Sequence, residues 1–255
     1  MKIATWNVNS LRVRLPQVLD WLQSHAPDVL CVQETKIEDR NFPQAEINEA
    51  GYEAVYRGQK TYNGVAIISR ARADGVTTAL PGADETQKRL IAATINGIRI
   101  VNVYVPNGAA VGSEKYAYKL DWLQHLNAYL TAELKRHPRL AVLGDYNIAP
   151  EDRDVHDPVA WEGSVLVSEQ ERDAFRELLA LGLVDVFRQF DQPEGSYSWW
   201  DYRAAAFRRN MGLRIDHVLC SAALAQRCQA CYIDTEPRRL TRPSDHAPVV
   251  AELKL

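Results

Sequence analysis

Polar residues suited to hydrolytic chemistry stand where short apolar runs of this sequence end or begin. Asp145 and Asn147 follow the run 140–143, which is typical of a buried strand. Glycine, aspartate and asparagine also form ordinary β-turns, so this stretch alone does not decide between a turn and a site. The pattern repeats, however, at Asn7, Glu34, Tyr104, Asn107, Asp216, Asp245 and His246. Strands lying side by side would bring these side chains together at one edge of a sheet.

The combined side chains offer carboxylate and amide oxygens and one imidazole. Such hard oxygen donors suit Mg²⁺ or Mn²⁺, whereas zinc favours histidine and cysteine. Mg²⁺ usually keeps waters and shares phosphate oxygens of its substrate, so one or two protein carboxylates suffice, and Glu34 is the first candidate ligand. The set predicts metal-assisted displacement at a phosphodiester, with a carboxylate positioning or deprotonating the attacking water.

His246 supplies the imidazole of this set. It follows Asp245 in the sequence, between two prolines, and could reach Asp216. Neighbouring carboxylates keep an imidazole protonated, and a cationic imidazole can bind a phosphate. The alternative is a solvent-exposed histidine without a role, which the adjacent acid and the prolines disfavour.

The opening of the chain has the pattern of a strand, a helix and a second strand. Residues 3–8 and 29–32 are apolar and strand-like, and helical spacing lies between them, with Pro16 tolerated only in the first turn. The two strands of such a unit run parallel. Asn7 and Glu34 are therefore expected at the same edge.

The middle of the chain adds antiparallel pairs to this plan. Two hairpins are predicted, the first through Asn63-Gly64 and the second through Asn96-Gly97. A helix over 115–136 then leads into the strand that ends at Asp145, and Ser168 opens a further helix with a capping box. Strands and helices alternate without a linker or a repeat, so a single α/β domain over residues 1–255 is expected.

Composition restricts the cellular setting. No run of about 18 apolar residues and no secretory signal is present, which predicts a cytoplasmic protein without membrane contact. The cysteines are too few for a disulfide scaffold, and Cys228 and Cys231 lack the second pair that zinc would require. They are interpreted as small buried thiols.

The charge of the chain indicates that any phosphate-binding surface is a local patch. The formal net charge is −3, so no global basic field attracts nucleic acid. Two groups of arginines could form local patches, although a solvated face is the commoner role of such runs. The groups are Arg203, Arg208, Arg209 and Arg214, and Arg238, Arg239 and Arg242.

Eight short motifs, in order along the whole chain, carry a resemblance to a known family. They are 5-TWNVN, 32-VQETK, 62-YNGVA, 104-YVPN, 144-GDYNI, 199-WWDYR, 212-GLRID and 244-SDHAP. The chain resembles the bacterial exonuclease III and abasic-site (AP) endonuclease family, in the superfamily that also holds pancreatic-type deoxyribonucleases and inositol phosphatases. The resemblance implies a four-layer αββα sandwich, in which two mixed β-sheets pack face to face with helices outside.

The resemblance also implies roles for individual residues. Glu34 would bind the metal with Asn7 nearby, and Asp145 would activate water or serve the leaving group while Asn147 orients the nucleophile. Further candidates on the metal side are Asn147, Asp145, Asp245 and His246. Asp216 and His246 would act as a pair on the scissile phosphate, and the division of roles between Asp145 and His246 stays open. The candidates for contact with the phosphate and the DNA are Tyr104, Asn107, Trp199, Arg203, Arg208 and Arg209.

The implied activity is that of a Mg²⁺-dependent DNA-repair nuclease, with Mn²⁺ as a substitute. It would combine 3′-5′ exonuclease, 3′-phosphodiesterase or phosphatase, and AP endonuclease reactions on double-stranded DNA with abasic sites or with blocked or recessed 3′ ends. A monomer with nucleoid-associated activity in a bacterial cytoplasm is expected. Two departures concern Ala109-Ala110, where animal relatives insert an arginine into DNA, and Asn9, where they have an aspartate.

Two alternatives remain open from the sequence. The first is a related phosphoesterase that acts on RNA or on another phosphate ester, and the Trp199 to Arg203 motif disfavours it. The second is a DNA-binding protein without catalysis, which the complete set of acids and the histidine disfavours.

Overall fold

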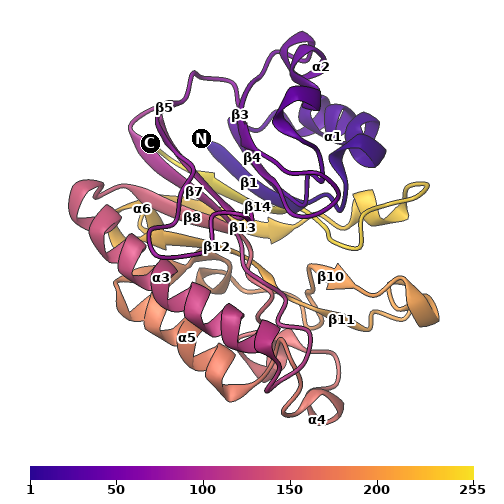
Figure 1. Ribbon diagram of the computed structural model, residues 1–255. Coiled ribbons are helices and arrows are strands. Elements are labelled where there is room, and N and C mark those ends of the chain that lie inside the picture. Colours follow the sequence, from indigo (N-terminus) through magenta and orange to yellow (C-terminus); the bar gives the residue numbers. More distant parts are fainter.

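Two mixed six-stranded sheets pack face to face and carry helices on their outer sides (Figure 1). This arrangement is seen in a computed structural model that describes residues 1–255. The strand order is β13-β14-β1-β2-β4-β3 in the first sheet and β5-β6-β7-β8-β12-β9 in the second. The four-layer sandwich expected from the sequence is thereby confirmed.

The first sheet contains β1 (Lys2–Asn7), β2 (Val29–Gln33), β3 (Glu53–Arg57), β4 (Val65–Ser69), β13 (Cys228–Ile233) and β14 (Val249–Leu253). Its outer face is covered by α1 (Leu11–His25), with α2 (Gln44–Glu49) beside it (Figure 1). As predicted, β1 and β2 run parallel, and they pair Asn7 with Gln33. Asn7 and Glu34 consequently stand at the same strand ends.

The second sheet contains β5 (Asp74–Thr77), β6 (Leu90–Ile95), β7 (Ile98–Tyr104), β8 (Leu140–Asp145), β9 (Leu183–Asp185) and β12 (Asp216–Ser221). The long helix α3 (Glu114–Arg136) and α5 (Glu169–Ala180) cover its outer face (Figure 1). The remaining α-helices are α4 (Pro158–Trp161) and α6 (Ala222–Ala225), and the remaining strands, β10 (Trp199–Trp200) and β11 (Gly212–Leu213), form a short hairpin.

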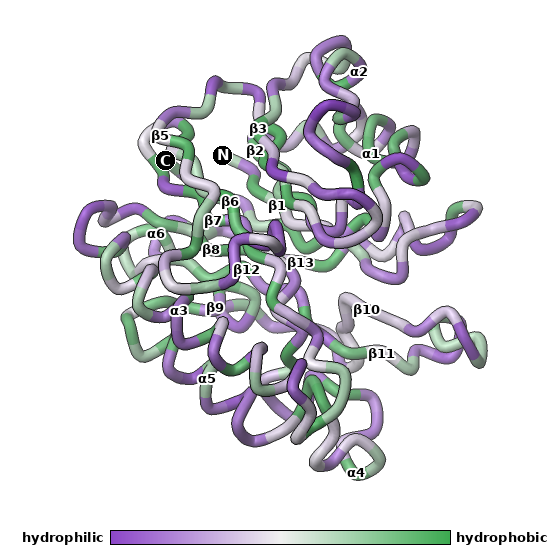
Figure 2. Tube along the Cα trace, in the orientation of Figure 1, coloured by the Kyte–Doolittle hydropathy of each residue, from purple (hydrophilic) through white to green (hydrophobic).

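Apolar side chains form a core in each of the spaces between layers. The inner faces of the two sheets share a cluster of 22 buried residues, and separate clusters lie under α1 and under α3 and α5. Because both faces of the central strands are covered, they are apolar at nearly every position, as the green strands of Figure 2 show. The polar segments, in purple, lie mainly in loops and on outer helix faces.

Two local expectations differ from the structure. Pro16 lies inside α1 rather than in its first turn, because that helix begins at Leu11, where the backbone N–H groups of Ser10 and Leu11 donate to carbonyls of Glu34 and Thr35. The sequence of residues 213–220 also predicts one continuous strand, but Arg214 and Ile215 interrupt it between β11 and β12. No helix is both long enough and apolar enough to cross a lipid bilayer.

Candidate active site

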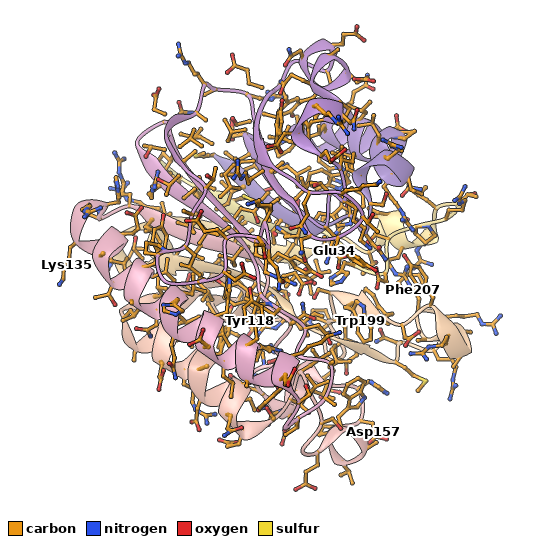
Figure 3. All side chains as sticks on the ribbon, viewed as in Figure 1. Glu34, Tyr118, Lys135, Asp157, Trp199 and Phe207 are labelled. Carbon is orange, nitrogen blue, oxygen red and sulfur yellow. The ribbon has the colours of Figure 1, made fainter.

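The ends of five strands meet at one edge of the sandwich, which is called the site edge below. It is formed by the carboxyl ends of β1, β2, β7 and β8 and by the start of β12. The register pairs Asp145 with Tyr104 on one side and with Asp216 on the other. Glu34 and Trp199 are labelled in this part of the molecule in Figure 3. The predicted gathering of polar side chains at one edge is thus what the fold produces.

His246 lies between two carboxylates at the site edge. Its Nδ1 is 2.9 Å from Oδ2 of Asp216, and its Nε2 is 3.8 Å from Oδ2 of Asp145. All three side chains are buried, with at most 4% of their surface exposed. They are also the group of acids and histidine whose potential ligand atoms lie within 4.8 Å of one another.

Burial and neighbouring charges shift the titration of this group. Burial alone would lower the pKa of His246, but the Asp216 and Asp145 carboxylates outweigh it and raise that pKa to about 10. Burial raises the pKa of Asp145 to about 7, opposed by His246 and supported by the charge of Asp216. At neutral pH the imidazole is therefore cationic. The pKa of Asp145 lies close to neutral pH, which suits a group that accepts and returns a proton.

Asn7 joins Glu34 to this group. Its Nδ2 donates to Oε1 of Glu34 at 2.9 Å and to Oδ2 of Asp145 at 2.8 Å. The hydroxyl of Tyr104 also donates to Oε1 of Glu34 at 2.9 Å, and the ammonium of Lys36 pairs with Oε2 at 2.8 Å. Burial works against ionisation of Glu34, but Lys36 and Asn7 hold its pKa below the usual value.

Asn147 and Asn107 complete the site on the side of the second sheet. The backbone N–H of Asn147 donates to Oδ1 of Asp145 at 2.9 Å, and its Nδ2 donates to Val105 O at 3.0 Å. Nδ2 of Asn107 donates to Oδ1 of Asn147 at 3.1 Å. Asn147 has φ of 50°, a left-handed conformation that asparagine tolerates better than most residues.

Asp245 and Trp199 lie at the margin rather than in the centre. The indole Nε1 of Trp199 donates to Oδ2 of Asp245 at 3.0 Å, and Nδ2 of Asn9 donates to Oδ1 at 3.0 Å. Trp199 also forms a β-bridge with His246 and is partly exposed. Both carboxylate oxygens of Asp245 therefore accept hydrogen bonds from neighbouring side chains.

The donor set fits a hard divalent cation. The carboxylates of Glu34 and Asp145 supply oxygen ligands of the kind that Mg²⁺ and Mn²⁺ prefer, and Nδ2 of Asn7 donates to both of them. The buried Oδ1 of Asp216 accepts no hydrogen bond from the protein, so it is available to a polar ligand. The residues at the site edge are thus compatible with a bound metal.

The arginines divide into exposed and buried ones. Arg203 is exposed and forms an ion pair with Asp201, and Arg208 and Arg209 are exposed on the same loop. Arg214 is not available for phosphate, contrary to the expected patch, because it is 1% exposed and pairs with Asp154 and Asp185.

Arg238 corrects the second expected patch in the same way. Its guanidinium is buried against the rings of Trp200 and Phe207 and donates to Ser244 O. Arg239 and Arg242 of that group remain exposed.

Ser198 is a site residue that sequence reasoning missed. Its hydroxyl donates to Oδ2 of Asp216 at 2.7 Å and accepts the backbone N–H groups of Ile215 and Asp216. It thereby fixes the carboxylate that contacts His246. Only its place between aromatic residues at the start of the 197–214 loop could have drawn attention to it. Lys36 belongs to one of the quoted motifs, but its pairing with Glu34 was not anticipated.

A two-sheet sandwich with carboxylates, amides and one imidazolium at its edge defines a hydrolase of the phosphoesterase class. Residues 4–246 match the Endonuclease/Exonuclease/phosphatase family, and the chain belongs to that family. Exodeoxyribonuclease III from Haemophilus influenzae is 34% identical over 100% of both chains. An exodeoxyribonuclease from Bacillus subtilis is 34% identical over 98% of each chain.

Solved structures show the same similarity. The 3′ phosphatase NExo from Neisseria, bound to a product DNA hairpin, is 48% identical with a TM-score of 0.98 over 100% of both chains. An AP endonuclease from Archaeoglobus fulgidus is 43% identical with a TM-score of 0.96, again over 100% of both chains.

Proposed function

We propose that this protein is a metal-dependent DNA-repair nuclease of the exodeoxyribonuclease III and AP endonuclease type. It hydrolyses DNA at 3′ ends, where it releases nucleotides or blocking groups, and at abasic sites, where it incises the backbone. The observation that carries the proposal is the buried contact of His246 with Asp216, beside Asp145. It places a cation for a phosphate next to a carboxyl group that can exchange a proton with water.

Two observations support DNA as the substrate: the activities named for the similar proteins, and the residues at the margin of the site. The similar proteins include exodeoxyribonucleases, a 3′ phosphatase bound to DNA and an AP endonuclease. Trp199 offers an apolar wall beside the His246 segment, which suits a deoxyribose. Exposed Arg203, Arg208 and Arg209 on the same loop suit backbone phosphates.

The side chains of this protein divide the hydrolysis among them. A water attacks phosphorus and passes its proton to Asp145, whose geometry is fixed by the amide of Asn7 and the backbone of Asn147. The imidazolium of His246, held by Asp216, balances the charge that develops on the phosphate oxygens. Tyr104, Asn107 and Asn147 supply further hydrogen-bond donors, and Asp145 and His246 together return a proton to the leaving oxygen.

The metal belongs on the first-sheet side of the site. We assign Glu34 as its principal ligand, with Asn7 and Asp145 as neighbours and with Asn147, Asp245 and His246 around them. When bound, Mg²⁺, or Mn²⁺ in its place, supplies charge neutralisation to the phosphate. Asn9 instead of an acid gives this side fewer negative charges, so weak binding of the metal is expected.

Two matched duplexes test the proposal. One carries a single synthetic abasic site, and the other is intact with a recessed 3′ end that bears a nucleotide or a 3′ phosphate. Both should be hydrolysed with Mg²⁺, neither in EDTA, and activity should return when Mg²⁺ or Mn²⁺ is added. Turnover that persists in EDTA, or faster cleavage of an RNA duplex of the same sequence, would contradict it. Light scattering on the same sample tests the expected monomer.

A further inference from the structure

A buried lysine lies directly beneath the two active-site asparagines. Lys119 belongs to α3 and has no exposed surface. Its Nζ donates to the backbone carbonyl of Asn147 at 2.6 Å and to that of Asn107 at 3.2 Å. One ammonium group therefore joins the loop that follows β7 to the loop that follows β8.

Glu171 extends this connection to a third loop. Its carboxylate pairs with Lys119 and accepts the backbone N–H groups of Leu166 at 3.0 Å and Ser168 at 3.1 Å. The side chain of Glu171 is also fully buried. The connection between α4 and α5 is thereby fixed against the floor of the site.

The packing around Lys119 shows that its position is closely determined. A Cβ at Gly108 would lie 3.1 Å from Cδ of Lys119, so the chain after Asn107 passes directly over the lysine stem. Gly108 has φ of 93°, which a residue with a side chain rarely adopts. Above this floor, the Asn107 and Asn147 side chains meet at 3.1 Å.

Stability alone does not account for a buried ion pair at this place. Removing two charges from water is costly, and replacing a buried ion pair by apolar residues of similar volume is often neutral or stabilising. A methionine could fill the space of Lys119, but it could not bind two carbonyl groups. What the ammonium adds is a fixed separation between the two loops.

We propose that Lys119, neutralised by Glu171, is a positioning residue that holds the side-chain amides of Asn107 and Asn147 at the reacting phosphate. It touches no reacting atom itself and acts through the two backbone carbonyls. The inference rests on the proposed function, because the effect is read in the hydrolysis of DNA. Misplacement of a positioning group by about 1 Å can cost 10²-fold in rate.

The molecule contains a matched control pair. Arg99 and Glu133 form another buried ion pair, at 2.6 Å, which joins the same helix α3 to strand β7, whereas the Lys119–Glu171 pair joins α3 to α5. Arg99 lies at the start of β7, whereas the site lies at its carboxyl end. Removing this pair tests the cost of losing a buried ion pair between these elements without touching the active-site loops.

The experiment compares Lys119→Met/Glu171→Gln with Arg99→Met/Glu133→Gln, at a temperature where both are folded by circular dichroism. On a 3′-phosphate duplex, we expect the first variant to lose at least about 10-fold in kcat with little change in KM. The control should keep the kcat of the unmodified protein, whatever stability it loses. Double variants avoid leaving one buried charge without its partner.

Coupling to Asn107 and Asn147 separates positioning from a general loosening of the fold. In an Asn107→Ala/Asn147→Ala background both amides are already absent, so the Lys119 and Glu171 changes should reduce kcat by less than about 2-fold. Equal losses in both backgrounds, an unchanged kcat in the first variant, or a similar loss in the control would overturn the proposal. Failure of the unmodified protein to hydrolyse DNA would instead refute the proposed nuclease function.

Discussion

The Nδ1 atom of His246 lies 2.9 Å from Oδ2 of Asp216, and the same carboxylate oxygen accepts the hydroxyl of Ser198 at 2.7 Å. The other oxygen of Asp216 is buried without a partner. The first oxygen thus orients the imidazole, and Ser198 holds that oxygen in place. Because β12 pairs Asp216 with Asp145, the imidazole also faces the second carboxylate.

The first prediction concerns this pair. His246→Ala removes the cation, and Asp216→Asn removes the charge that holds it, so each should lower kcat on a 3′-end substrate by about 10²–10⁴-fold. Ser198→Ala should have a smaller effect in the same direction, because it leaves both partners in place. Near-normal turnover in a folded His246→Ala protein would remove the imidazole from the mechanism.

The second prediction separates metal binding from water activation. Glu34→Ala removes the principal ligand proposed for the metal, so its activity should be low at ordinary Mg²⁺ and should recover in part at high Mg²⁺. Asp145→Asn keeps the shape but removes the proton acceptor, so excess Mg²⁺ should not restore it. Titration of both variants with Mg²⁺ distinguishes the roles. If Mg²⁺ rescued both variants to the same extent, the roles assigned to these two acids would be wrong.

The site edge could be predicted from the sequence because its signals are local. Apolar runs that end in polar residues mark strand ends, and the parallel arrangement of a strand-helix-strand unit brings two such ends together. Asn7 and Glu34 show this most clearly, since β1 and β2 pair as expected. The remaining residues of the site edge were assigned from the eight motifs that carry the family resemblance.

Residues whose partners are distant in sequence could not be assigned in this way. Arg214 looked like a candidate for phosphate, but it is buried with Asp154, which lies 60 positions away. The local sequence does not distinguish Lys119 from other residues of a helix or Ser198 from other residues of a loop. Their contacts depend on how α3 and the β10–β11 hairpin pack. Sequence patterns give the period of an element but not the partner of a buried polar group.

The third prediction is acid sensitivity of the fold through His217. Burial and the neighbouring Arg214 lower the pKa of this histidine to about 4, although Asp185 and Asp154 work in the opposite direction. The unfolded chain therefore takes up a proton first as the pH falls below about 6.5. At about 1.4 kcal/mol per pH unit, the free energy of unfolding should fall by about 3 kcal/mol between pH 6.5 and pH 4.

His217→Gln is the matched control for that measurement. Glutamine does not titrate, yet it can donate to Ile148 O and accept from Arg214, as the histidine ring does. Urea unfolding of both proteins at several pH values gives the difference directly. Stabilities that fall in parallel over this range would show that His217 titrates normally in the folded protein.

The fourth prediction places part of the DNA contact on the 197–214 loop. Arg208 and Arg209 are exposed there, and each neutralised phosphate contributes a slope of about −0.9 to the salt dependence of binding to duplex DNA. Changing both to alanine should make the slope less negative by about 2. Arg176→Ala, on the outer helix α5, is the control and should leave it unchanged. An unaltered slope in the double variant would place the phosphate contacts elsewhere.

The last prediction tests whether Trp199 forms a pocket for a base-free sugar. Abasic incision requires the damaged nucleotide to leave the helix, at a cost of a few kcal/mol, whereas trimming of a 3′ end does not require an internal extrusion. Ala109 and Ala110 offer no long side chain to hold the duplex open. Contact of the sugar with Trp199 is therefore expected to offset more of this free-energy cost.

Trp199→Ala should therefore lower incision at an abasic site far more than removal of a terminal 3′ phosphate. Trp199→Phe keeps an aromatic wall but loses the hydrogen bond of the indole to Asp245, and it should preserve most of the incision. If Trp199→Phe is as defective as Trp199→Ala, the indole acts by holding Asp245 in place. Equal losses on both substrates would describe an enzyme directed to 3′ ends, in which Trp199 supports the phosphate site and not a sugar pocket.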